Sequence, residues 1–592
     1  MSVSDTAQSV LDTLVGVDGM RLAGMTLCAF VTALGAVPVA PALASTDGLA
    51  HFTRSQTAAV PTMLSGEDRA YYASLFEAVD SDNWTRVEVL LSQRPDGPLH
   101  GSALAAYYLD PGSPRIDLLR IENWLRRYSG HPQAEAIVRL GQTRGLSFVP
   151  ALPQPNALVR QPGITRRKLP DPARDATMPA SVASAILDRI KNDDPDGARL
   201  LLDGVDASLS AEARAEWRQR VAWSYYIENR DAEAYAMAQQ VAQGSGAWVA
   251  EGDWTAGLAA WRLGDCNRAG QYFNAASRSA GDAELKVAAH YWAARSLVRC
   301  REPDAATAHL RAAARYDETL YGMLAAEQLG TQLPSDHAAD SFTAENWRTL
   351  SAAPAVREAV MLTEIGRTDL ADEALRWQAR YGDPRSYTPL TRLARALGLT
   401  GAQTFMAYNA PRGSAAPQHL RWPVTYKQPY GEWRIDPALA FAHALQESNF
   451  REGVVSPAGA IGLMQIMPIA RREYAASINM SDGADLKDAR VNLAFGQRTL
   501  EALARAGYTG GALPKVMAAY NAGPTPVARW NSEVNDQGDP LLWMESLPYW
   551  ETRSYVNIVM RNYWMYLRQA QANAPSRVDL AENDWPRFPA TR

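Results

Sequence analysis

A glutamate near the end of a predicted apolar helix is the residue of this chain best suited to acid chemistry. Asp436 and Pro437 are typical of a helix start, as N-cap and first-turn residue, and the stretch ALAFAHALQES follows. Glu447 shares a stripe of this helix with Ala440 and Ala444. Because apolar surroundings disfavour ionisation, they raise the pKa of a carboxyl group, and a protonated glutamate can donate a proton to a glycosidic oxygen. On this stretch alone, a solvent-facing glutamate in a surface helix is the simpler interpretation.

The segment VSPAGAIGLMQIMP (455–468) follows this helix and combines a turn with an apolar run. Gly459 and Gly462 allow the backbone to approach a ligand closely. Gln465 is the one polar side chain in GLMQIM, which favours a pocket wall with a single hydrogen-bonding group. The alternative is a core segment in which Gln465 caps a local backbone group.

Two further segments place polar side chains at helix ends. In ALPKVMAAYNAGP (512–524) the final Gly-Pro is predicted to stop a helix, so that Tyr520 and Asn521 can project into a cleft. PYWETRSYV (548–556) opens the last long helix, with Glu551 at an N-terminus where the helix dipole favours a carboxylate. An ordinary helix end and a plain cap are the alternatives for these two segments.

Together these motifs resemble the catalytic domain of the soluble lytic murein transglycosylases, which has a goose-type-lysozyme-like fold. They occur in the family's order as QES (446–448), SPAGAIGLMQIMP (456–468), AAYNAGP (518–524) and PYWETRSYV (548–556). Any one of them is a weak signal, whereas all four in order are highly specific.

Carried over onto this sequence, the resemblance implies that Glu447 is the catalytic acid. The residues that it implies for binding the glycan are Ser448, Ser456, Gln465, Met467, Tyr520, Asn521, Glu551 and Tyr555. The chain departs from the family pattern at Leu445, where members often carry Arg, and in the PTPV that follows AYNAG in place of a glycine-containing turn. Both departures concern the cleft and leave the acid in place.

The reaction implied by the resemblance uses one carboxyl group, although most glycosidases use two. Glu447 acts as acid and then as base at the bond between N-acetylmuramic acid and N-acetylglucosamine of a peptidoglycan strand. The 6-hydroxyl of the muramoyl sugar closes onto C1, which leaves a 1,6-anhydro end and requires neither water nor cofactor. Such an enzyme is a carbon–oxygen lyase, with exo- or endo-action left open. The alternatives are hydrolysis, as in goose-type lysozymes, and a non-catalytic periplasmic scaffold that binds peptidoglycan.

Ala-rich helical stretches separated by short polar breaks occupy the chain from residue 45 to about 410. Three of them share one plan of helix, turn and Ala-rich helix, namely AWSYYIENRDAEAYAMAQQVA (222–242), AWRLGDCNRAGQYFNAASRSA (260–280) and AARSLVRCREPDAATAHLRAA (293–313). A repeat in the mid-thirties with two helices per unit is typical of an α-solenoid. The predicted fold class is therefore all-α, a long α-solenoid followed by a compact, mainly α lysozyme-like catalytic domain.

The predicted divisions follow changes in composition along the chain. They are a signal-peptide region at 1–44, an α-solenoid at 45–340 with a Pro-rich, basic linker near 147–180, a helical linker domain at 341–415, the catalytic domain at 416–575 and a polar tail at 576–592.

The N-terminal sequence predicts export. Arg21 precedes an apolar run, and the Ala-Leu-Ala that ends at Ala44 is typical of a cleavage site, although the true start could be Met20. The run is short and interrupted by prolines, so we expect a periplasmic protein that is peripheral to the membrane at most. Peptidoglycan glycan strands are the expected partner, with cell-wall synthesis proteins as further candidates.

Net charge and cysteine usage exclude some classes of site. A net charge of −5 and a pI near 6.0 give no support for a nucleic-acid partner. No CxxC or HExxH spacing predicts a metal site. Cys266 and Cys300 hold similar places in two repeats, and an oxidising compartment permits a disulfide between them, but buried free thiols would have the same sequence pattern.

Overall fold

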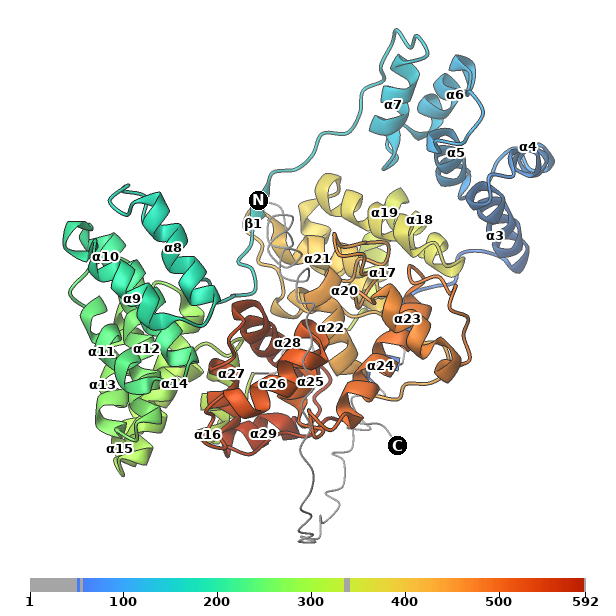
Figure 1. The fold of residues 1–592 in the computed structure, drawn as a ribbon. Helices are drawn as coiled ribbons and strands as arrows, with labels where there is room; N and C mark the ends of the chain where they lie inside the picture. The colour runs from blue at the N-terminus through green and yellow to red at the C-terminus, as the bar shows by residue number, and fades with distance from the viewer. Residues whose placement is uncertain (1–50, 54–56, 335–340, 590–592) are drawn as a thin grey trace, which may run out of the picture.

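Two large hydrophobic cores organise the chain (Figure 1). The computed structural model describes residues 51–53, 57–334 and 341–589, which are almost entirely helical or in loops. The predicted signal peptide lies outside the described residues. Among the described residues, no helix combines the length and apolar character needed to cross a membrane. The all-α class and the solenoid predicted from the sequence are confirmed.

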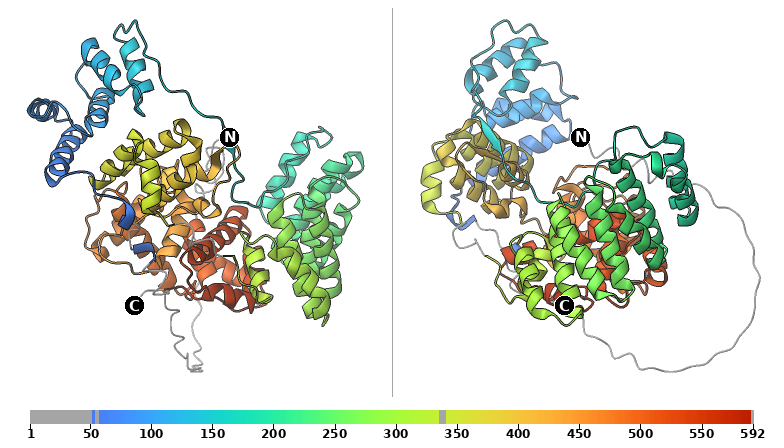
Figure 2. Two further views of the ribbon diagram at one scale, coloured as in Figure 1. Left: turned by 180° about the vertical axis from the view of Figure 1, so that it is seen from behind. Right: turned by 90° about the vertical axis from the view of Figure 1, so that its left-hand side faces the viewer.

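One core joins the N-terminal helices to the predicted linker domain, although about 200 residues separate them in sequence. The N-terminal elements are η2 (Thr57–Ala59), α3 (Gly66–Asp80), α4 (Trp84–Gln93), α5 (His100–Leu109), α6 (Leu118–Tyr128) and α7 (Ala134–Gln142). Those of the linker region are α17 (Ala344–Leu350), α18 (Pro354–Glu364), α19 (Thr368–Tyr381), η5 (Pro384–Ser386), α20 (Tyr387–Ala396), α21 (Thr400–Tyr408), β2 (Asn409–Pro411) and η6 (Gln418–Arg421). The predicted solenoid is thus divided, and its first helices lie apart from the rest (Figure 2).

The continuous part of the solenoid shares the second core with the C-terminal domain. Its elements are α8 (Ala180–Lys191), α9 (Pro195–Asp203), η3 (Asp206–Ser208), α10 (Ala211–Ile227), α11 (Asp231–Val241), α12 (Trp248–Arg262), α13 (Cys266–Ser279), α14 (Ala283–Arg299), α15 (Pro303–Ala314) and α16 (Leu320–Gln328). Successive helices pack on one another, and a disulfide joins Cys266 at the start of α13 to Cys300 at the end of α14. The structure thereby resolves the alternative that the sequence left open for these cysteines.

A strap, which we define as residues 143–179, links α7 to α8 and is fixed at several points along its length. Its strand β1 (Leu158–Arg160) pairs antiparallel with β2, Leu158 opposite Pro411. Further along, the Thr165 carbonyl accepts a hydrogen bond from Arg561 Nη1 at 2.6 Å, and Trp248 Nε1 donates to the Asp171 carbonyl at 3.0 Å. The segment that the composition predicted as a linker is therefore held against the linker region, the C-terminal domain and the solenoid in turn.

The C-terminal domain lies beside the solenoid (Figure 1). Its elements are α22 (Pro437–Ser448), α23 (Pro468–Tyr474), η7 (Ala475–Ile478), α24 (Ala489–Arg505), α25 (Leu513–Ala522), α26 (Pro524–Glu533), α27 (Pro540–Glu545), α28 (Trp550–Gln569) and α29 (Pro575–Ala581). The predicted polar tail contains α29, in which Leu580 is fully buried, and Phe588 is also buried. These apolar side chains, with a bond from Trp564 Nε1 to Ser576 Oγ at 2.9 Å, pack the segment into the domain, so the description as a tail is corrected.

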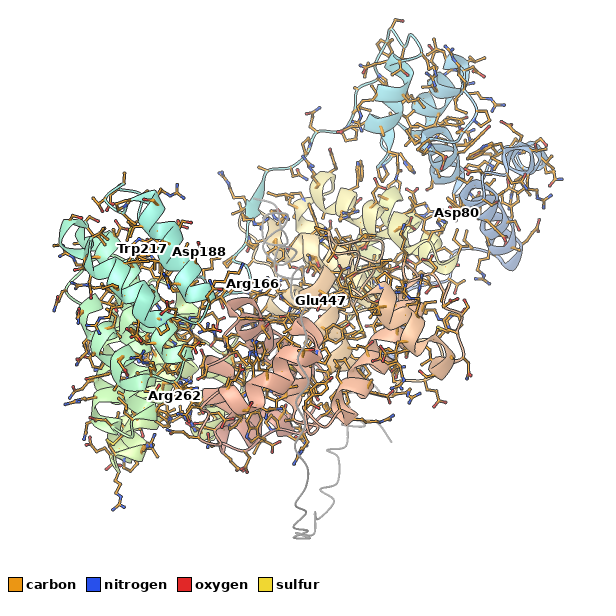
Figure 3. The ribbon with its side chains drawn as sticks, in the orientation of Figure 1. Asp80, Arg166, Asp188, Trp217, Arg262 and Glu447 are labelled. Carbon is orange, nitrogen blue, oxygen red and sulfur yellow. A yellow bond between two sulfur atoms is a disulfide. The ribbon has the colours of Figure 1, made fainter. Side chains whose placement is uncertain are left out.

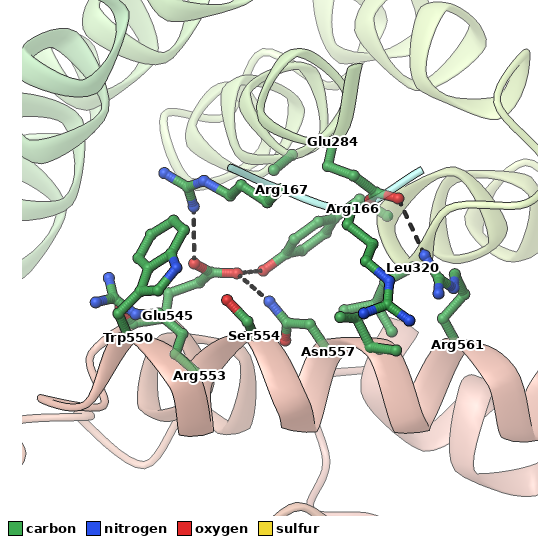
Figure 4. A pocket seen from close by; sticks show the side chains of 13 residues that line it. Arg166, Arg167, Glu284, Leu320, Glu545, Trp550, Arg553, Ser554, Asn557 and Arg561 are labelled. Atoms are coloured by element: carbon green, nitrogen blue, oxygen red, sulfur yellow. Dashed lines mark hydrogen bonds and ion pairs between the residues drawn. The ribbon is translucent and has the colours of Figure 1, made fainter. Parts of the chain in front are cut away.

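One face of α28 meets the solenoid and the strap through buried charged groups (Figure 4). Glu545 is 1% exposed and accepts hydrogen bonds from Tyr321 Oη at 2.7 Å and Asn557 Nδ2 at 3.1 Å. Arg167 of the strap lies 3.4 Å from Glu545 and 2.8 Å from Glu251 of α12. Removing one partner of a buried ion pair leaves an uncompensated charge, so these contacts fix the position of α28 against the solenoid.

The disulfide generates a prediction about stability. Replacing Cys266 and Cys300 by Ser removes a cross-link that closes a loop of sequence separation 34, and should lower the free energy of unfolding by about 2–4 kcal/mol. The measurement is the thermal unfolding midpoint by circular dichroism, with the wild-type protein in reductant as the control. Equal midpoints for the oxidised wild type and the double variant would contradict the prediction.

Candidate active site

Helix α22 carries Glu447 in its last turn and is buried almost all round. Asp436 is the N-cap, as predicted, and accepts a hydrogen bond from the Ala438 amide at 2.9 Å. Its other carboxylate oxygen accepts from Tyr563 Oη of α28 at 2.9 Å. The helix ends at Ser448, and its C-cap Asn449 has a left-handed φ of +52°. Instead of one apolar stripe, every residue from Pro437 to Leu445 is buried, so α22 is a central helix of the domain.

A chain of three polar groups runs from Glu447 into the core. Tyr555 Oη of α28 donates a hydrogen bond to Glu447 Oε1 at 2.6 Å, and His443 Nδ1 lies 2.8 Å from the same hydroxyl. His443 is fully buried, and its Nε2 has no partner among the described residues. With Glu447 ionised, the hydroxyl proton points to the carboxylate and His443 donates to the hydroxyl oxygen. Reversal of both bonds would move the imidazole proton to Nε2, which has no partner, so Tyr555 Oη donates to Oε1 in both states of Glu447 and the acid proton lies on the other carboxyl oxygen.

Burial raises the pKa of Glu447 to about 7, which leaves a large fraction of it protonated at neutral pH. The Tyr555 hydrogen bond acts in the opposite direction and lowers the pKa, while the negative charge of Glu551 adds a further rise. Burial also lowers the pKa of His443 to about 3, so the imidazole is neutral. The site therefore holds one acid whose pKa suits proton donation and proton acceptance near neutral pH.

The loop 454–467 is folded tightly beside Glu447. Ser456 Oγ accepts a hydrogen bond from the Ala460 amide at 3.0 Å, which closes the predicted turn. Asn492 is buried and binds the loop backbone, donating to the Ile461 carbonyl and accepting from the Met464 amide, each at 2.8 Å. Gly462 has a φ of +80°, and a Cβ there would lie 2.2 Å from Asn492 Nδ2. The loop thus depends on glycine at this position.

The predicted binding residues of this loop have different surroundings. Gln465 has a φ of +50°, and its amide donates to the Gly462 carbonyl at 2.9 Å, so it caps a local group while remaining partly exposed. Met467 is 40% exposed at the start of α23. Ser448 is different, because it is 2% exposed and its hydroxyl donates to the Leu463 carbonyl at 2.7 Å. The substrate contact predicted for Ser448 is therefore corrected to a role in holding the loop.

The ends of α25 and α28 complete the site. Tyr520 Oη donates to the Met464 carbonyl at 2.7 Å, and its ring packs on His443 with centroids 4.7 Å apart. Asn521 Oδ1 accepts a hydrogen bond from Thr552 Oγ1 at 2.7 Å. Glu551 is exposed in the first turn of α28, where the helix dipole favours a carboxylate. Four segments distant in sequence thus meet at Glu447.

His443 is the site residue whose role the sequence did not predict. It lies one turn before Glu447 on α22, and this spacing of four residues is the signal that places both side chains on one face. Its partner Tyr555 was expected to bind substrate, whereas its hydroxyl contacts Glu447 directly.

Comparison with known proteins gives a family-model match within this domain and several similar proteins. Residues 426–542 match the model of the transglycosylase SLT domain. A soluble lytic murein transglycosylase of Escherichia coli K12 is 31% identical over 169 residues, which cover 27% of this chain and 26% of that protein. A protein of the same description from Salmonella typhimurium is 27% identical over 315 residues, 52% of this chain and 47% of the relative. The aligned parts span less than half of either relative.

Solved structures extend the likeness to the architecture. The 70-kDa soluble lytic transglycosylase of Escherichia coli covers 88% of this chain and 99% of its own, with a TM-score of 0.53 and 18% identity. An inactive Glu-to-Gln mutant of the lytic transglycosylase Slt from Pseudomonas aeruginosa covers 85% of this chain and 78% of its own, with a TM-score of 0.51 and 20% identity. At these identities the likeness concerns the fold. This chain is therefore a multidomain helical protein that carries a transglycosylase SLT domain and resembles the soluble lytic murein transglycosylases.

Proposed function

We propose that this protein is a lytic transglycosylase that cleaves peptidoglycan glycan strands between N-acetylmuramic acid and N-acetylglucosamine. The observation that carries the proposal is Glu447, a carboxyl group whose pKa is raised to about 7 inside an SLT domain. The relatives that match the chain are described as soluble lytic murein transglycosylases, and murein is peptidoglycan.

In the first step, Glu447 donates its proton to the glycosidic oxygen. The bond between this oxygen and C1 of the muramoyl sugar breaks, the N-acetylglucosamine hydroxyl leaves, and positive charge develops on the muramoyl ring. The N-acetyl group of the substrate can assist by stabilising C1. The newly ionised Glu447 accepts the hydrogen bond of Tyr555 Oη, which stabilises its charge.

In the second step, the ionised Glu447 removes the proton of the muramoyl 6-hydroxyl. The oxygen then bonds to C1, which gives the 1,6-anhydro ring and returns Glu447 to its protonated state. No water is consumed, so the products balance the substrate without a second reactant. Ser456, Gln465, Met467, Tyr520, Asn521 and Glu551 are the residues that we assign to binding the glycan around this acid.

The proposal places the enzyme in the periplasm, where its polymer substrate lies. This location rests on the export signal predicted at 1–44 and on the description of the relatives as murein transglycosylases. Hydrolysis by the same acid is the competing reaction, and its product is a reducing end in place of an anhydro end.

Replacing Glu447 with Gln keeps the size of the side chain and removes the acid. We expect product release from purified peptidoglycan to fall about 10²–10⁴-fold, and the wild-type products to carry 1,6-anhydromuramoyl ends by mass spectrometry. Glu582→Gln makes the same change at an exposed position after α29 and should keep wild-type activity. Products with reducing ends would show that the reaction is hydrolysis and not transglycosylation. Wild-type activity in the Glu447→Gln variant would show that Glu447 is not the catalytic acid.

The same Glu447→Gln variant should be more stable than the wild type at alkaline pH. Because the folded pKa of about 7 lies above the usual value of 4.5, the free energy of unfolding falls as the pH rises from about 4.5 to 7 and then stays level, and the neutral amide avoids this cost. We expect a gain of about 3 kcal/mol at pH 8 and none at pH 4, where the carboxyl is protonated in both states. Chemical denaturation at the two pH values is the measurement. An equal gain in the free energy of unfolding at pH 4 and pH 8 would contradict a raised pKa of Glu447.

Tyr555→Phe should shift the pH dependence of cleavage. Loss of the hydrogen bond removes the contribution that lowers the pKa of Glu447, so the alkaline limb of the activity profile should move up by about one pH unit. Tyr520→Phe is the matched control, because the Tyr520 hydroxyl binds the Met464 carbonyl and not Glu447. Its alkaline limb should stay in place even if its rate falls. Equal shifts in the two variants would show that Tyr555 has no specific link to the acid.

A further inference from the structure

A groove of about 320 Å³ lies between the N-terminal helices and the linker region. It is bordered by the turn before α7, the start of the strap, α19 and α21. The lining residues that matter for its chemistry are Glu135, Glu373, Arg376, Trp377, Arg380 and Tyr381. A volume of this size is in the range of small-ligand sites. None of the lining residues belongs to the C-terminal domain, so the groove is separate from the site around Glu447 and from the contact between that domain and the solenoid.

Helix α19, which forms one wall of the groove, is held at both ends by other segments. Arg367, directly before the helix, pairs with Asp80 at the end of α3 (Figure 3). Just after its other end, the Asn156 side chain of the strap donates a hydrogen bond to the Gly382 carbonyl at 2.6 Å. The groove is therefore formed before any ligand binds, which lowers the cost of ordering its walls.

Two aromatic rings of α19 form a flat surface in the groove. Trp377 and Tyr381 are one helical turn apart, and their rings stack with centroids 4.9 Å apart and an angle of 19° between their planes. Both side chains are partly exposed. Phe405 of α21 adds a third ring to the lining. Such a surface suits a ligand that presents C–H groups on one flat face, as a sugar ring does.

The carboxylates of the groove are engaged, whereas its arginines are not. Glu135 accepts a hydrogen bond from Tyr381 Oη at 3.2 Å, and Glu373 accepts one from the side-chain amide of the α7 N-cap at 2.6 Å. Arg376 and Arg380 are exposed and lie on one face of α19, four residues apart. Within the ranges that the structure describes, neither arginine forms an ion pair with a carboxylate. Their guanidinium groups thus leave donors for an anionic group beside the aromatic surface.

The lining therefore selects a flat, hydroxylated ring that carries an anionic group. A muramoyl sugar without its peptide has both properties, because its lactyl ether then ends in a free carboxylate. We propose that the groove binds peptide-free stretches of a peptidoglycan strand, with a sugar ring on Trp377 and the lactyl carboxylate on Arg376 and Arg380. In a strand that still carries its peptides, this carboxyl group is part of an amide bond and has no charge to offer.

This inference rests on the proposed function, because that function supplies the glycan strand. Arg376 also lines a second cavity, of about 330 Å³, which reaches residues 449–453 after α22 and Leu463 of the active-site loop. A strand in the groove can therefore extend along α19 toward the loop beside Glu447. The groove would hold the enzyme on strands from which the peptides have been removed.

The test uses the full chain with Glu447→Gln, which binds without cleaving, and isothermal titration calorimetry. The first probe is a peptide-free tetrasaccharide of alternating N-acetylglucosamine and N-acetylmuramic acid. We expect two binding sites per chain, one in the catalytic cleft and one in the groove. Arg380→Gln should raise the Kd of the groove site about tenfold and leave the cleft site unchanged.

Two further probes separate the contributions of the ring and the charge. Chitotetraose has the same β-1,4-linked backbone without carboxylates, so its binding to the groove should be weakened by Trp377→Ala and unaffected by Arg380→Gln. Trp377→Phe keeps an aromatic ring and should restore much of the binding, which distinguishes loss of the surface from loss of the fold. The tetrasaccharide with its peptides should bind the groove more weakly than the peptide-free probe, and equal binding would contradict a contact with the lactyl carboxylate.

Arg348→Gln is the matched control, since Arg348 is exposed on α17 and does not line the groove. It should keep both sites. A single binding site in the Glu447→Gln protein would overturn the proposal, as would equal affinities of the groove site in the Arg380→Gln and Arg348→Gln variants. The proposed function is tested separately by the anhydro products of the wild-type enzyme. A missing groove site with anhydro products intact would refute this inference alone, and two sites without anhydro products would refute only the reaction.

Discussion

The packing of α22 against α28 is the constraint on which the rest of the molecule depends. It brings a carboxyl group from one helix and a hydroxyl group from the other to within 2.6 Å, inside a core that excludes most of the water. A second contact between the same helices, from Tyr563 Oη to Asp436, fixes the start of α22. With both ends of the pair fixed, Glu447 is held between the two helices, and its raised pKa follows from this placement.

The opposite face of α28 connects the C-terminal domain to the solenoid and the strap. On that face, Arg553 stacks on Trp223 of the solenoid, and Arg561 bonds to the Thr165 carbonyl of the strap and pairs with Glu284 of α14. These contacts are buried and charged, so they are specific in geometry and costly to break on one side only. The solenoid therefore supports the helix that supplies Tyr555, and it does so through a segment, the strap, that has no regular structure apart from β1. An insertion in the strap would act on the active site through α28.

Local sequence signals predicted the helices and turns of the site well, because their causes are local. Asp436-Pro437 begins α22, Gly523 ends α25, and the turn at Ser456 closes as expected. Contacts between distant segments were not predictable in this way. The pairing of the N-terminal helices with α17–α21 depends on complementary apolar faces, and the burial of Ser448 depends on the Leu463 carbonyl that reaches it. The segment 576–592 was predicted to be a tail because most of its residues are polar, but its buried Leu580 and Phe588 pack it into the domain.

One carboxyl group that acts in turn as acid and base needs opposing influences on its pKa. Burial alone would hold the proton on Glu447 and make the ionised state after bond cleavage costly. Hydrogen bonding by Tyr555 alone would favour the carboxylate and leave too little acid for the first step. The two influences act together here and leave the pKa at about 7. His443 is a neutral, buried partner of the Tyr555 hydroxyl, whose proton is directed at Glu447 Oε1 and leaves the other carboxyl oxygen to give and take the proton of the proposed reaction. In the proposed reaction, the same three side chains would serve both steps without a second carboxylate.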